Sequence, residues 1–395
     1  MRNKPRLLTP GPTPLPEEVR LALAKDMIHH RKADFIRIME SLSPKLQTLF
    51  GTTQQVLPLS CSGTGAMYAA ISNLLQPGET ALVVEGGKFG ERWREIAQAQ
   101  GVLTISLVQQ PGEAVAPQDV AQALDAHPEI KAVLVQASET STGVMHPVHE
   151  LGTITASRDV LLVVDGISAV GISPCPMDAW QIDCLLTGSQ KGLMLPPGLA
   201  LISLSTRAWA CVEKNAASHF YFNLLAERDK NTRHQTLFTS PVNLIQGLAV
   251  SLDLFASQGF STMYRKQWAL TCMARAGLTS LGLDLVAPTH FTWGLTSVWM
   301  PGGVSASAVL AHAAKEYGVV MAGGQGELKN SIVRLGHMGY VDWADVLAGL
   351  YAVQQSLHQA GGYSAARRPL EDAMQAYEQA WKQGHPLLNT GEYPL

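Results

Sequence analysis

Short runs of apolar residues recur through the first 260 residues of the chain, and turn-forming or polar residues bound each run. Runs this short and this apolar are typical of strands that are buried on both faces of a parallel sheet. Segments with helical periodicity separate most of the runs, which occur at 57–60, 81–84, 105–108, 132–135, 160–164, 184–186 and 199–204. This alternation predicts an α/β fold in which a mainly parallel seven-stranded sheet lies between helices.

The pattern changes near residue 260, where a helix over about 264–281 introduces strands and helices with antiparallel signals. A chain of 395 residues is also too long for one ordinary core. The opening of the chain is rich in proline and cannot form the interior of a helix, because each proline removes a donor and fixes φ. We therefore predict an N-terminal arm (1–15), a large domain (16–259), a smaller α+β C-terminal domain (260–365) and a helical tail (366–395).

Hydrophobic residues make up 46% of the chain and charged residues 15%, which is typical of a well-buried globular protein. The formal net charge of −3 gives no electrostatic reason to expect nucleic acid or an anionic membrane as a partner. The five cysteines are scattered without a CxxC pair, which indicates reduced thiols rather than a disulfide framework or a metal site. No signal region and no run of the ~18 apolar residues of a membrane span is present. We therefore expect a soluble protein of the cytoplasm.

Polar clusters follow four of the predicted strands, at 61–65, 136–143, 165–168 and 187–191. Ligands of open α/β sheets bind outside the carboxyl ends of the strands. Because these clusters all follow strands, we expect them to meet at one edge of the sheet. Their convergence is a stronger signal than any single cluster, and it predicts a ligand site at this edge.

Two of these clusters place a charged residue next to a buried strand, with Asp165 at the end of 160–164 and Lys191 shortly after 184–186. An isolated buried charge costs on the order of several kcal/mol unless it is paired or its pKa shifts. Pyridoxal 5′-phosphate (PLP) chemistry needs such a pair. A partly neutral lysine amine forms a Schiff base, and an ionised aspartate keeps the ring nitrogen protonated. For the two residues taken alone, a surface lysine and a helix-capping aspartate are the ordinary interpretation.

Two further features fit a ligand that carries a phosphate and an aromatic ring. Ser62-Gly63-Thr64 lies between a strand and a helix, where free N–H groups, hydroxyl donors and the positive end of the helix dipole bind anions. Phe89, which is flanked by glycines after the strand at 81–84, lies where an aromatic side chain could stack on a flat ring. A plain helix cap and an ordinary core phenylalanine are the alternatives for these two features.

Several motifs then occur in one order along the chain: Thr9-Pro10-Gly11-Pro12-Thr13, Ser62-Gly63-Thr64, Glu139-Thr140-Ser141-Thr142-Gly143, Val164-Asp165, Gly188-Ser189-Gln190-Lys191 and Arg334-Leu335-Gly336. In this order they resemble the class V aminotransferases of fold type I, and most closely the alanine–glyoxylate and serine–pyruvate aminotransferase group. The resemblance runs from residue 9 to about residue 355. The segment around Lys191, with Pro196-Pro197-Gly198 after it, is highly specific.

The resemblance implies PLP as the cofactor and a role for each matching residue. Lys191 would form the Schiff base, and Asp165 would pair with the ring nitrogen. Arg334 would bind the α-carboxylate of the substrate, beside Gly11, because its planar donors suit a carboxylate. Ser62, Gly63, Thr64 and Gln190 would hold the phosphate, and further contacts to the cofactor would come from Phe89, Thr140 and Ile167.

The resemblance also implies a homodimer in which the neighbouring subunit completes each active site. That subunit would add Thr239 and Thr236 to the phosphate site. The position of Thr236 is a tyrosine in some members of the group, and the position of Phe89 is often a tryptophan.

These roles imply a PLP-dependent aminotransferase with a ping-pong mechanism. It would move an amino group from alanine or serine to a small 2-oxo acid, glyoxylate or pyruvate, with Lys191 carrying the proton. An aspartate or ureidoglycine aminotransferase is an alternative within the class. A cysteine desulfurase-like lyase is another, although 323–331 contains no cysteine to act as its nucleophile. A scaffold subunit of a redox assembly is an alternative from another class, because proteins that resemble this chain have been labelled hydrogenase subunits.

Overall fold

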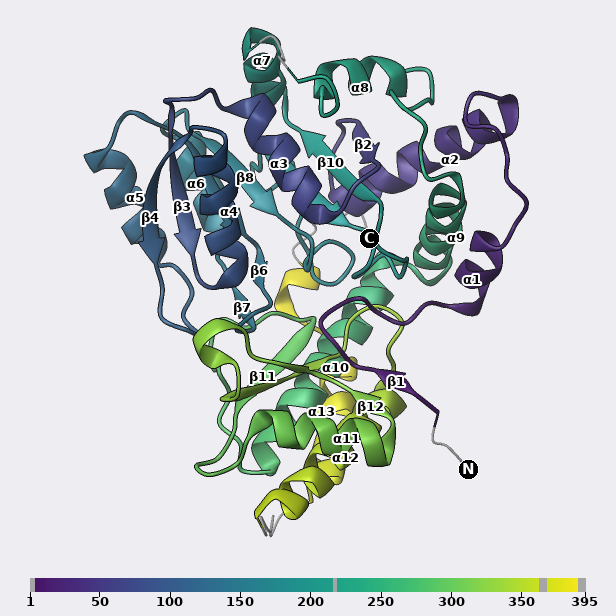
Figure 1. Cartoon of the computed structure of the whole chain (residues 1–395), viewed down its shortest axis with the longest axis vertical. Helices are drawn as coiled ribbons and strands as arrows, with labels where there is room; N and C mark the ends of the chain where they lie inside the picture. Colours follow the sequence, from purple (N-terminus) through teal and green to yellow (C-terminus); the bar gives the residue numbers. More distant parts are fainter. Residues whose placement is uncertain (1–3, 216–218, 362–367, 390–395) are drawn as a thin grey trace.

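The computed structural model describes residues 4–215, 219–361 and 368–389, and a sheet of seven strands forms its centre (Figure 1). The strands lie in the order β2-β10-β9-β8-β5-β3-β4. Neighbours from β9 to β4 pair in parallel, whereas β10 pairs antiparallel with both β9 and β2. The strands are β2 (Val56–Leu59), β3 (Thr80–Glu85), β4 (Leu103–Val108), β5 (Ile130–Gln136), β8 (Leu161–Asp165), β9 (Cys184–Gly188) and β10 (Ala200–Leu204). The predicted α/β fold with a mainly parallel sheet of seven strands is confirmed.

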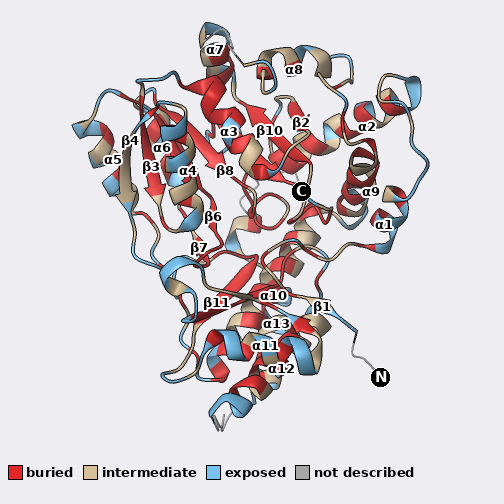
Figure 2. Cartoon of the chain, viewed as in Figure 1, coloured by how far each residue is buried: buried red, intermediate tan, exposed pale blue. Residues whose placement is uncertain are grey.

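Two hydrophobic cores lie on the two faces of this sheet, because successive residues of a strand point to opposite faces. In β8, Leu162 and Val164 belong to one core, whereas Leu161 and Val163 belong to the other. The first core is covered by α1 (Glu17–Leu23), α2 (Ala33–Phe50), α5 (Pro117–Ala126), α6 (Val148–Ala156) and α9 (Val242–Gln258). The second is covered by α3 (Gly63–Leu74), α4 (Lys88–Ala99), α7 (Thr206–Asn215) and α8 (Leu224–Asn231). Figure 2 shows the buried strands between these two helical layers.

A third hydrophobic core lies in the C-terminal part of the chain, below the large sheet in Figure 1. Its helices are α10 (Phe260–Ser280), α11 (Ala306–Tyr317), α12 (Trp343–Gly361) and α13 (Pro369–Gln383). They pack against an antiparallel sheet of β11 (Leu295–Trp299), β14 (Ile332–Gly336) and β13 (Ala322–Gly323). The antiparallel pairing expected here is confirmed. Within the described ranges, no helix combines the length and the apolar character that crossing a membrane requires.

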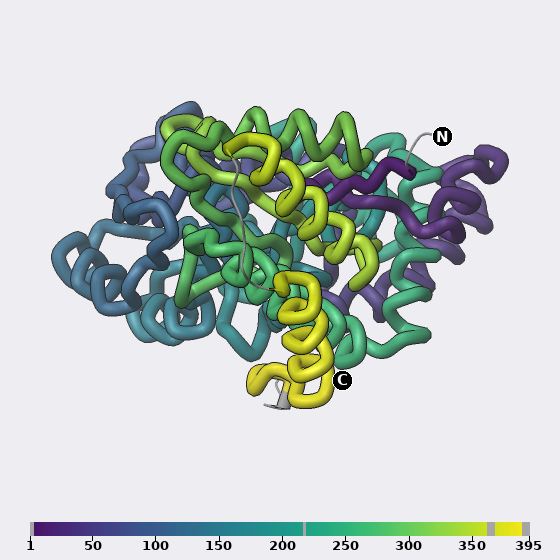
Figure 3. Tube along the Cα trace, turned by 90° about the horizontal axis from the view of Figure 1, so that it is seen from below, coloured from purple at the N-terminus to yellow at the C-terminus, as the bar shows by residue number. Residues whose placement is uncertain are grey.

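The N-terminal arm is joined to this C-terminal part by a small parallel sheet. In it β1 (Arg6–Leu7) pairs with β12 (Val319–Val320), so the two segments lie side by side in both views (Figures 1 and 3). The short elements that complete the fold are the hairpin of β6 (Ser138–Glu139) and β7 (Val144–Met145) and the 3-10 helices η1 (Gly326–Leu328) and η2 (Pro386–Asn389). The division of the chain at residues 15, 259 and 365 stays a prediction.

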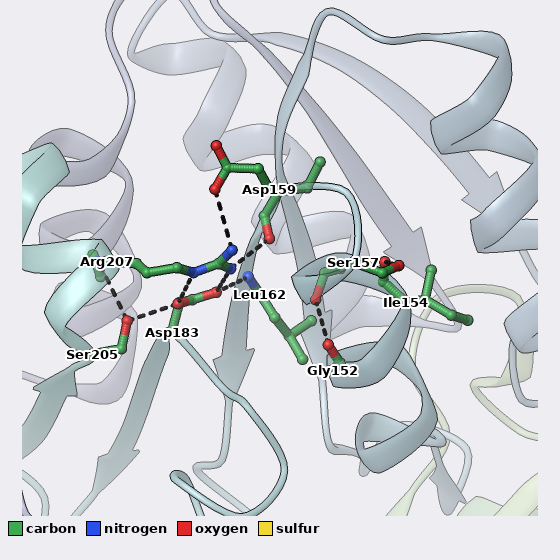
Figure 4. A network of polar contacts seen from close by, with 11 residues as sticks. Gly152, Ile154, Ser157, Asp159, Leu162, Asp183, Ser205 and Arg207 are labelled. Carbon is green, nitrogen blue, oxygen red and sulfur yellow. Dashed lines mark hydrogen bonds and ion pairs between the residues drawn. The ribbon is translucent and has the colours of Figure 1, made fainter.

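A buried polar network holds the amino ends of β8 and β9 together (Figure 4). The Asp183 carboxylate accepts hydrogen bonds from the backbone N–H of Leu162 at 2.9 Å and from the hydroxyl of Ser205 at 2.7 Å. It also accepts from Nη2 of Arg207 at 2.6 Å. The side chain of Asp183 is 4% exposed, whereas that of Asp159, which pairs with the same arginine, is 98% exposed. The network therefore fixes β8 relative to β9 at the end of the sheet opposite Asp165.

We expect Asp183→Ala to lower the free energy of unfolding by about 1–3 kcal/mol, because the change leaves the buried N–H of Leu162 without its acceptor and removes the buried partner of the half-exposed Arg207. Asp159→Ala is the matched control, since it removes the exposed partner of the same guanidinium, and it should change stability little. Denaturant unfolding followed by circular dichroism measures both variants. Equal losses in the two variants would contradict the assignment of stability to the buried carboxylate.

Candidate active site

The carboxyl edge of the central sheet contains a cavity of about 250 Å³. Asp165, the last residue of β8, and Lys191, which follows β9, both line it. The other predicted site residues that line this cavity are Gly11, Ser62, Gly63, Thr64, Phe89, Thr140, Ile167 and Gln190. The clusters that follow different strands in the sequence therefore meet in one place, as the strand pattern predicted.

Lys191 is buried, and its environment favours the neutral amine. Burial is the main reason that the pKa of Lys191 is lowered to about 8; Asp165 opposes this shift, and the positive charges of Arg334 and Arg92 contribute to it. At pH 7 roughly one such amine in ten is neutral, compared with about one in 3,000 for an ordinary lysine. The Nζ atom donates a hydrogen bond to the carbonyl oxygen of Pro10. A nucleophilic amine is therefore available at neutral pH without a separate base.

The N-terminal arm forms the wall of the cavity behind this lysine. Thr13 donates from its hydroxyl to the backbone oxygen of Lys191 at 3.0 Å and from its N–H to that of Gln190 at 3.1 Å. Gly11 has a φ of 118°, and a Cβ atom there would lie 2.6 Å from Cε of Lys191. Only glycine fits this position, because a side chain would need both the strained backbone and the space that the lysine occupies. The arm thus holds the backbone of Lys191 and leaves room for its side chain.

Asp165 is the only acidic residue among the described residues that line the cavity. Its Oδ1 accepts a hydrogen bond from the N–H of Ile167 at 2.7 Å. Burial is the main reason that the pKa of Asp165 is raised to about 7; the N–H of Ile167 opposes this shift, and the nearby Glu139 contributes to it. A buried carboxyl group with a raised pKa becomes a stable carboxylate when a cation lies beside it. Asp165 is therefore suited to face a protonated nitrogen.

The N-terminus of α3 offers an anion site on the wall of the same cavity. Ser62 is the N-cap of this helix, and its hydroxyl accepts a hydrogen bond from the N–H of Gly65 at 3.3 Å. At Gly63 a Cβ atom would lie 2.9 Å from Cγ1 of Ile167, so a larger residue would have to displace that side chain. Free backbone N–H groups at the start of α3 and the hydroxyl of Thr64 can donate to an anion. The buried Oε1 of Gln190, which has no hydrogen-bond partner among the described residues, is an acceptor, so Gln190 can contribute only through its amide N–H groups. The helix N-terminus therefore fits a phosphate-bearing ligand.

Glu139 joins two predicted contacts of the cofactor, Phe89 and Thr140. One carboxylate oxygen accepts from the N–H groups of Phe89 at 3.0 Å and Gly90 at 3.1 Å, which begin α4. The other accepts from the hydroxyl and the N–H of Ser141 at 2.5 and 3.1 Å. Burial raises the pKa of Glu139, and these donors oppose the rise. This positioning role was not predicted, although Glu139 begins the motif that contains Thr140.

Arg334 lies beside the cavity but is not part of its wall in the structure. It is a buried residue of β14, and its Nη1 donates to the carbonyl oxygen of Thr140 at 2.6 Å. Its Nε donates to the carbonyl oxygen of Gly323 at 2.8 Å. Burial lowers the pKa of Arg334, and its charge lowers the pKa of Lys191. The guanidinium therefore acts on the cavity through its charge.

Thr236 and Thr239 do not line this cavity. The hydroxyl of Thr236 donates to the carbonyl oxygen of Phe238 at 2.7 Å, within its own segment. Thr239 is exposed and lines a different hollow together with residues 27–30. Their assignment to the active site of a neighbouring subunit stays a prediction.

The cavity also contains Arg92, which the sequence did not single out, and four residues of the predicted motifs and clusters to which no role was assigned: Pro12, Ser138, Ser168 and Pro197. Arg92 follows Phe89 by three positions on α4, and residues at this spacing lie on the same face of a helix. That spacing is the signal that could have identified it. The amine, the carboxylate and the helix N-terminus together fit PLP, which carries an aldehyde, a ring nitrogen and a phosphate.

Comparison with known proteins agrees with this geometry. The chain matches the family model of class V aminotransferases over residues 10–346. It is 36% identical over 384 residues to the small subunit of a soluble hydrogenase from Synechococcus sp., which covers 94% of this chain and 100% of that one. It is 31% identical to the L-aspartate–glyoxylate aminotransferase of Paracoccus denitrificans, with 91% of this chain and 93% of that one covered. Its identity to the serine–glyoxylate aminotransferase of Methylorubrum extorquens is 30%, with 89% and 90% covered.

Solved structures of aminotransferases have the same fold. The ureidoglycine–glyoxylate aminotransferase of Bacillus subtilis gives a TM-score of 0.89 at 25% identity and covers 96% of this chain and 99% of that one. The alanine–glyoxylate aminotransferase of Nostoc sp. gives a TM-score of 0.84 at 29% identity and covers 90% and 96%. Because the family model spans most of the sequence and the site fits the cofactor, the chain belongs to the class V aminotransferases and is a PLP-dependent transaminase.

Proposed function

We propose that this enzyme moves the amino group of alanine or serine to glyoxylate or pyruvate, with Lys191, Asp165 and Arg334 as the principal residues. The observation that supports this most is the buried pair of Lys191 and Asp165 in a single cavity. Arg334, whose charge reaches Lys191, lies beside them.

Different observations support the proposed acceptor and the proposed donor. Four of the similar proteins carry glyoxylate in their names, and their donors are aspartate, serine, ureidoglycine and alanine. Glyoxylate is therefore the acceptor that we favour. A small donor agrees with the small residues near the reacting groups, where Gly11 contacts Lys191 and Gly323 contacts Arg334. Aspartate and ureidoglycine stay the alternative donors.

The proposed mechanism assigns the proton transfer to Lys191. PLP, when bound, supplies the electron sink that allows the substrate Cα to release its proton. Lys191 would hold the cofactor through its Nζ atom. The same atom would accept the proton of the donor Cα and would protonate Cα of the product when the acceptor is converted to an amino acid. The lowered pKa of Lys191 supports this role, because a neutral amine is needed to accept a proton.

The other charged residues orient the reactants in this proposal. Arg334 binds the α-carboxylate of donor and acceptor through its paired N–H groups. Asp165 keeps the ring nitrogen protonated. Ser62, Gly63, Thr64 and Gln190 bind the phosphate, while Phe89, Thr140 and Ile167 contact the ring. Glu139 keeps Phe89 and the loop of Thr140 in place through its hydrogen bonds.

A panel of substrates tests the proposed function. The PLP-loaded enzyme is mixed with alanine, serine, aspartate or ureidoglycine, each together with glyoxylate or pyruvate, and the amino and oxo products are quantified. Alanine or serine with glyoxylate should give the highest kcat/KM. A higher kcat/KM for aspartate or ureidoglycine would show that the proposed donor is wrong. If none of these donors supports transfer to either acceptor, the proposed function is refuted.

We infer that the enzyme is a homodimer whose subunits complete each other's active sites. An exposed aromatic patch supports this inference, because Phe220 is 85% exposed and Tyr221 is 51% exposed and stacks on Phe238 at 5.3 Å. The neighbouring Thr239 is exposed, and Arg31 holds the backbone oxygen of Thr236 at 2.7 Å. Light scattering should give twice the mass of the chain, and the mass of one chain would refute the inference.

The five free thiols are our reason for placing the enzyme in the cytoplasm, which cell fractionation tests.

A further inference from the structure

Arg92 is a cation of the active-site cavity that none of the roles above uses. It belongs to α4, and its guanidinium lies over the ring of Phe89, 4.9 Å from the ring centroid. Its Nη1 donates to the hydroxyl of Thr64 at 3.3 Å, so it reaches the N-terminus of α3. A cation over an aromatic face is held in place by the ring quadrupole. Arg92 is thus fixed between the ring-stacking position and the proposed phosphate site.

The charge of Arg92 is not neutralised by the protein. In the described part of the chain it forms no ion pair, whereas Lys88 and Arg94 on the same helix pair with Glu91 and Glu85. Its positive charge acts on Lys191 and Asp165, which places it electrostatically in the same cavity. A partly buried guanidinium without a carboxylate partner is suited to bind an anionic ligand.

A phosphate at the N-terminus of α3 needs a cation of this kind. The phosphate monoester carries about −1.5 to −2 charges at pH 7, whereas a helix N-terminus contributes only about +0.5. Ser62, Thr64 and Gln190 add dipoles without net charge. Among the described residues that line the cavity, Lys191 is the only other cation, and its amine must stay neutral to react. Most of the phosphate charge is therefore uncompensated unless Arg92 binds it.

We propose that Arg92 is the residue that neutralises the phosphate of the cofactor, acting across Thr64. The inference rests on the proposed placement of the phosphate at Ser62-Gly63-Thr64. It makes Arg92 a determinant of selectivity for a phosphorylated ring, because a ring without the phosphate offers Arg92 no anion. Arg92 thereby also lies where it supports the ring contact of Phe89.

The test measures binding to the full-length apoenzyme rather than turnover. PLP and pyridoxal, which differ only in the phosphate, are titrated into wild type, Arg92→Gln and Arg94→Gln, and the dissociation constants follow from quenching of tryptophan fluorescence. Arg92→Gln should weaken PLP about 10- to 100-fold, as expected for loss of a charged hydrogen bond, and should weaken pyridoxal much less. Arg94→Gln is the matched control on the same helix, and it should change neither constant, since Arg94 pairs with Glu85 instead.

Two results would overturn the inference. An unchanged PLP constant in Arg92→Gln would show that Arg92 does not meet the phosphate. An equal loss for PLP and pyridoxal would show that Arg92 acts by positioning Phe89. Arg92→Lys keeps the charge and should retain more PLP affinity than Arg92→Gln, so it covers the case in which the glutamine variant folds poorly. Ser62→Ala tests the phosphate site separately. If it weakens PLP alone while Arg92→Gln weakens nothing, the site is correct and the inference about Arg92 is wrong.

Discussion

Lys191→Ala should lose amino-group transfer almost completely, by at least ~10³-fold in kcat, while the fold is retained. Proton transfer by a positioned base alone contributes about 10²–10⁴-fold, and the variant also loses the covalent attachment of PLP. The fold should persist because the side chain lies in a cavity, and its hydrogen bond to Pro10 is a single contact. Product formation from the preferred donor and glyoxylate measures the loss, and circular dichroism verifies the fold.

Two controls make this result specific to the neutral amine. Lys191→Arg keeps the positive charge next to Asp165 but has no group that is neutral at pH 7, so it should be as inactive as the alanine variant. A small external amine such as methylamine should restore part of the activity of Lys191→Ala, because it can accept the proton in the vacated space. Lys88→Ala, which removes an exposed lysine that pairs with Glu91, should leave turnover unchanged. Wild-type turnover in Lys191→Ala would refute the assignment.

The sequence was sufficient to predict the large sheet and the edge at which the site lies. Six of the seven strands are short and apolar because both of their faces pack against helices, so their burial can be recognised from their composition; the edge strand β4 is only partly buried. Asp165 and Lys191 stood out for the same reason, since they are charged residues next to buried strands. Features that one strand and its following loop encode are therefore visible in the sequence alone.

Contacts between distant segments cannot be recognised from the composition of either segment. The pairing of β1 with β12 depends on only two residues of each strand, and their partners are about 310 positions apart in the chain. Glu139 reads as one polar residue among several, and its four hydrogen bonds depend on how the start of α4 meets the loop after β5. Arg92 reads as one of several charged residues on an amphipathic helix, and only the orientation of α4 brings it to the cavity.

The buried charged residues at the two ends of the sheet have different roles. At the amino ends of the strands, Asp183 has its four hydrogen bonds satisfied within the protein, so its role is structural. At the carboxyl ends, Lys191 and Asp165 keep shifted pKa values that a ligand can restore toward normal. A buried charge that the protein leaves incompletely satisfied is expected where a ligand binds, at a cost in stability.

Arg334→Ala should lower kcat/KM for every substrate with an α-carboxylate by about 10- to 100-fold, whatever its side chain. The reason is the loss of charge-assisted hydrogen bonds, which contribute about 1.5–3 kcal/mol. The decisive measurement is a ratio, the kcat/KM for alanine divided by that for ethylamine, which lacks the carboxylate. Wild type should strongly prefer alanine, and Arg334→Ala should lose most of this preference.

This ratio separates binding of the carboxylate from damage to the site. Arg334 also holds the carbonyl oxygens of Thr140 and Gly323, so its removal loosens the loop around Thr140 for every substrate. Such loosening lowers the rates with alanine and ethylamine together and leaves the ratio unchanged. Arg275 is a matched control, because it is a partly buried arginine that also donates to two carbonyl oxygens, those of Ala287 and Pro288, at 2.9 and 2.8 Å. Arg275→Ala should reduce stability and keep the preference for alanine, whereas an unchanged ratio in Arg334→Ala would show that the carboxylate is bound elsewhere.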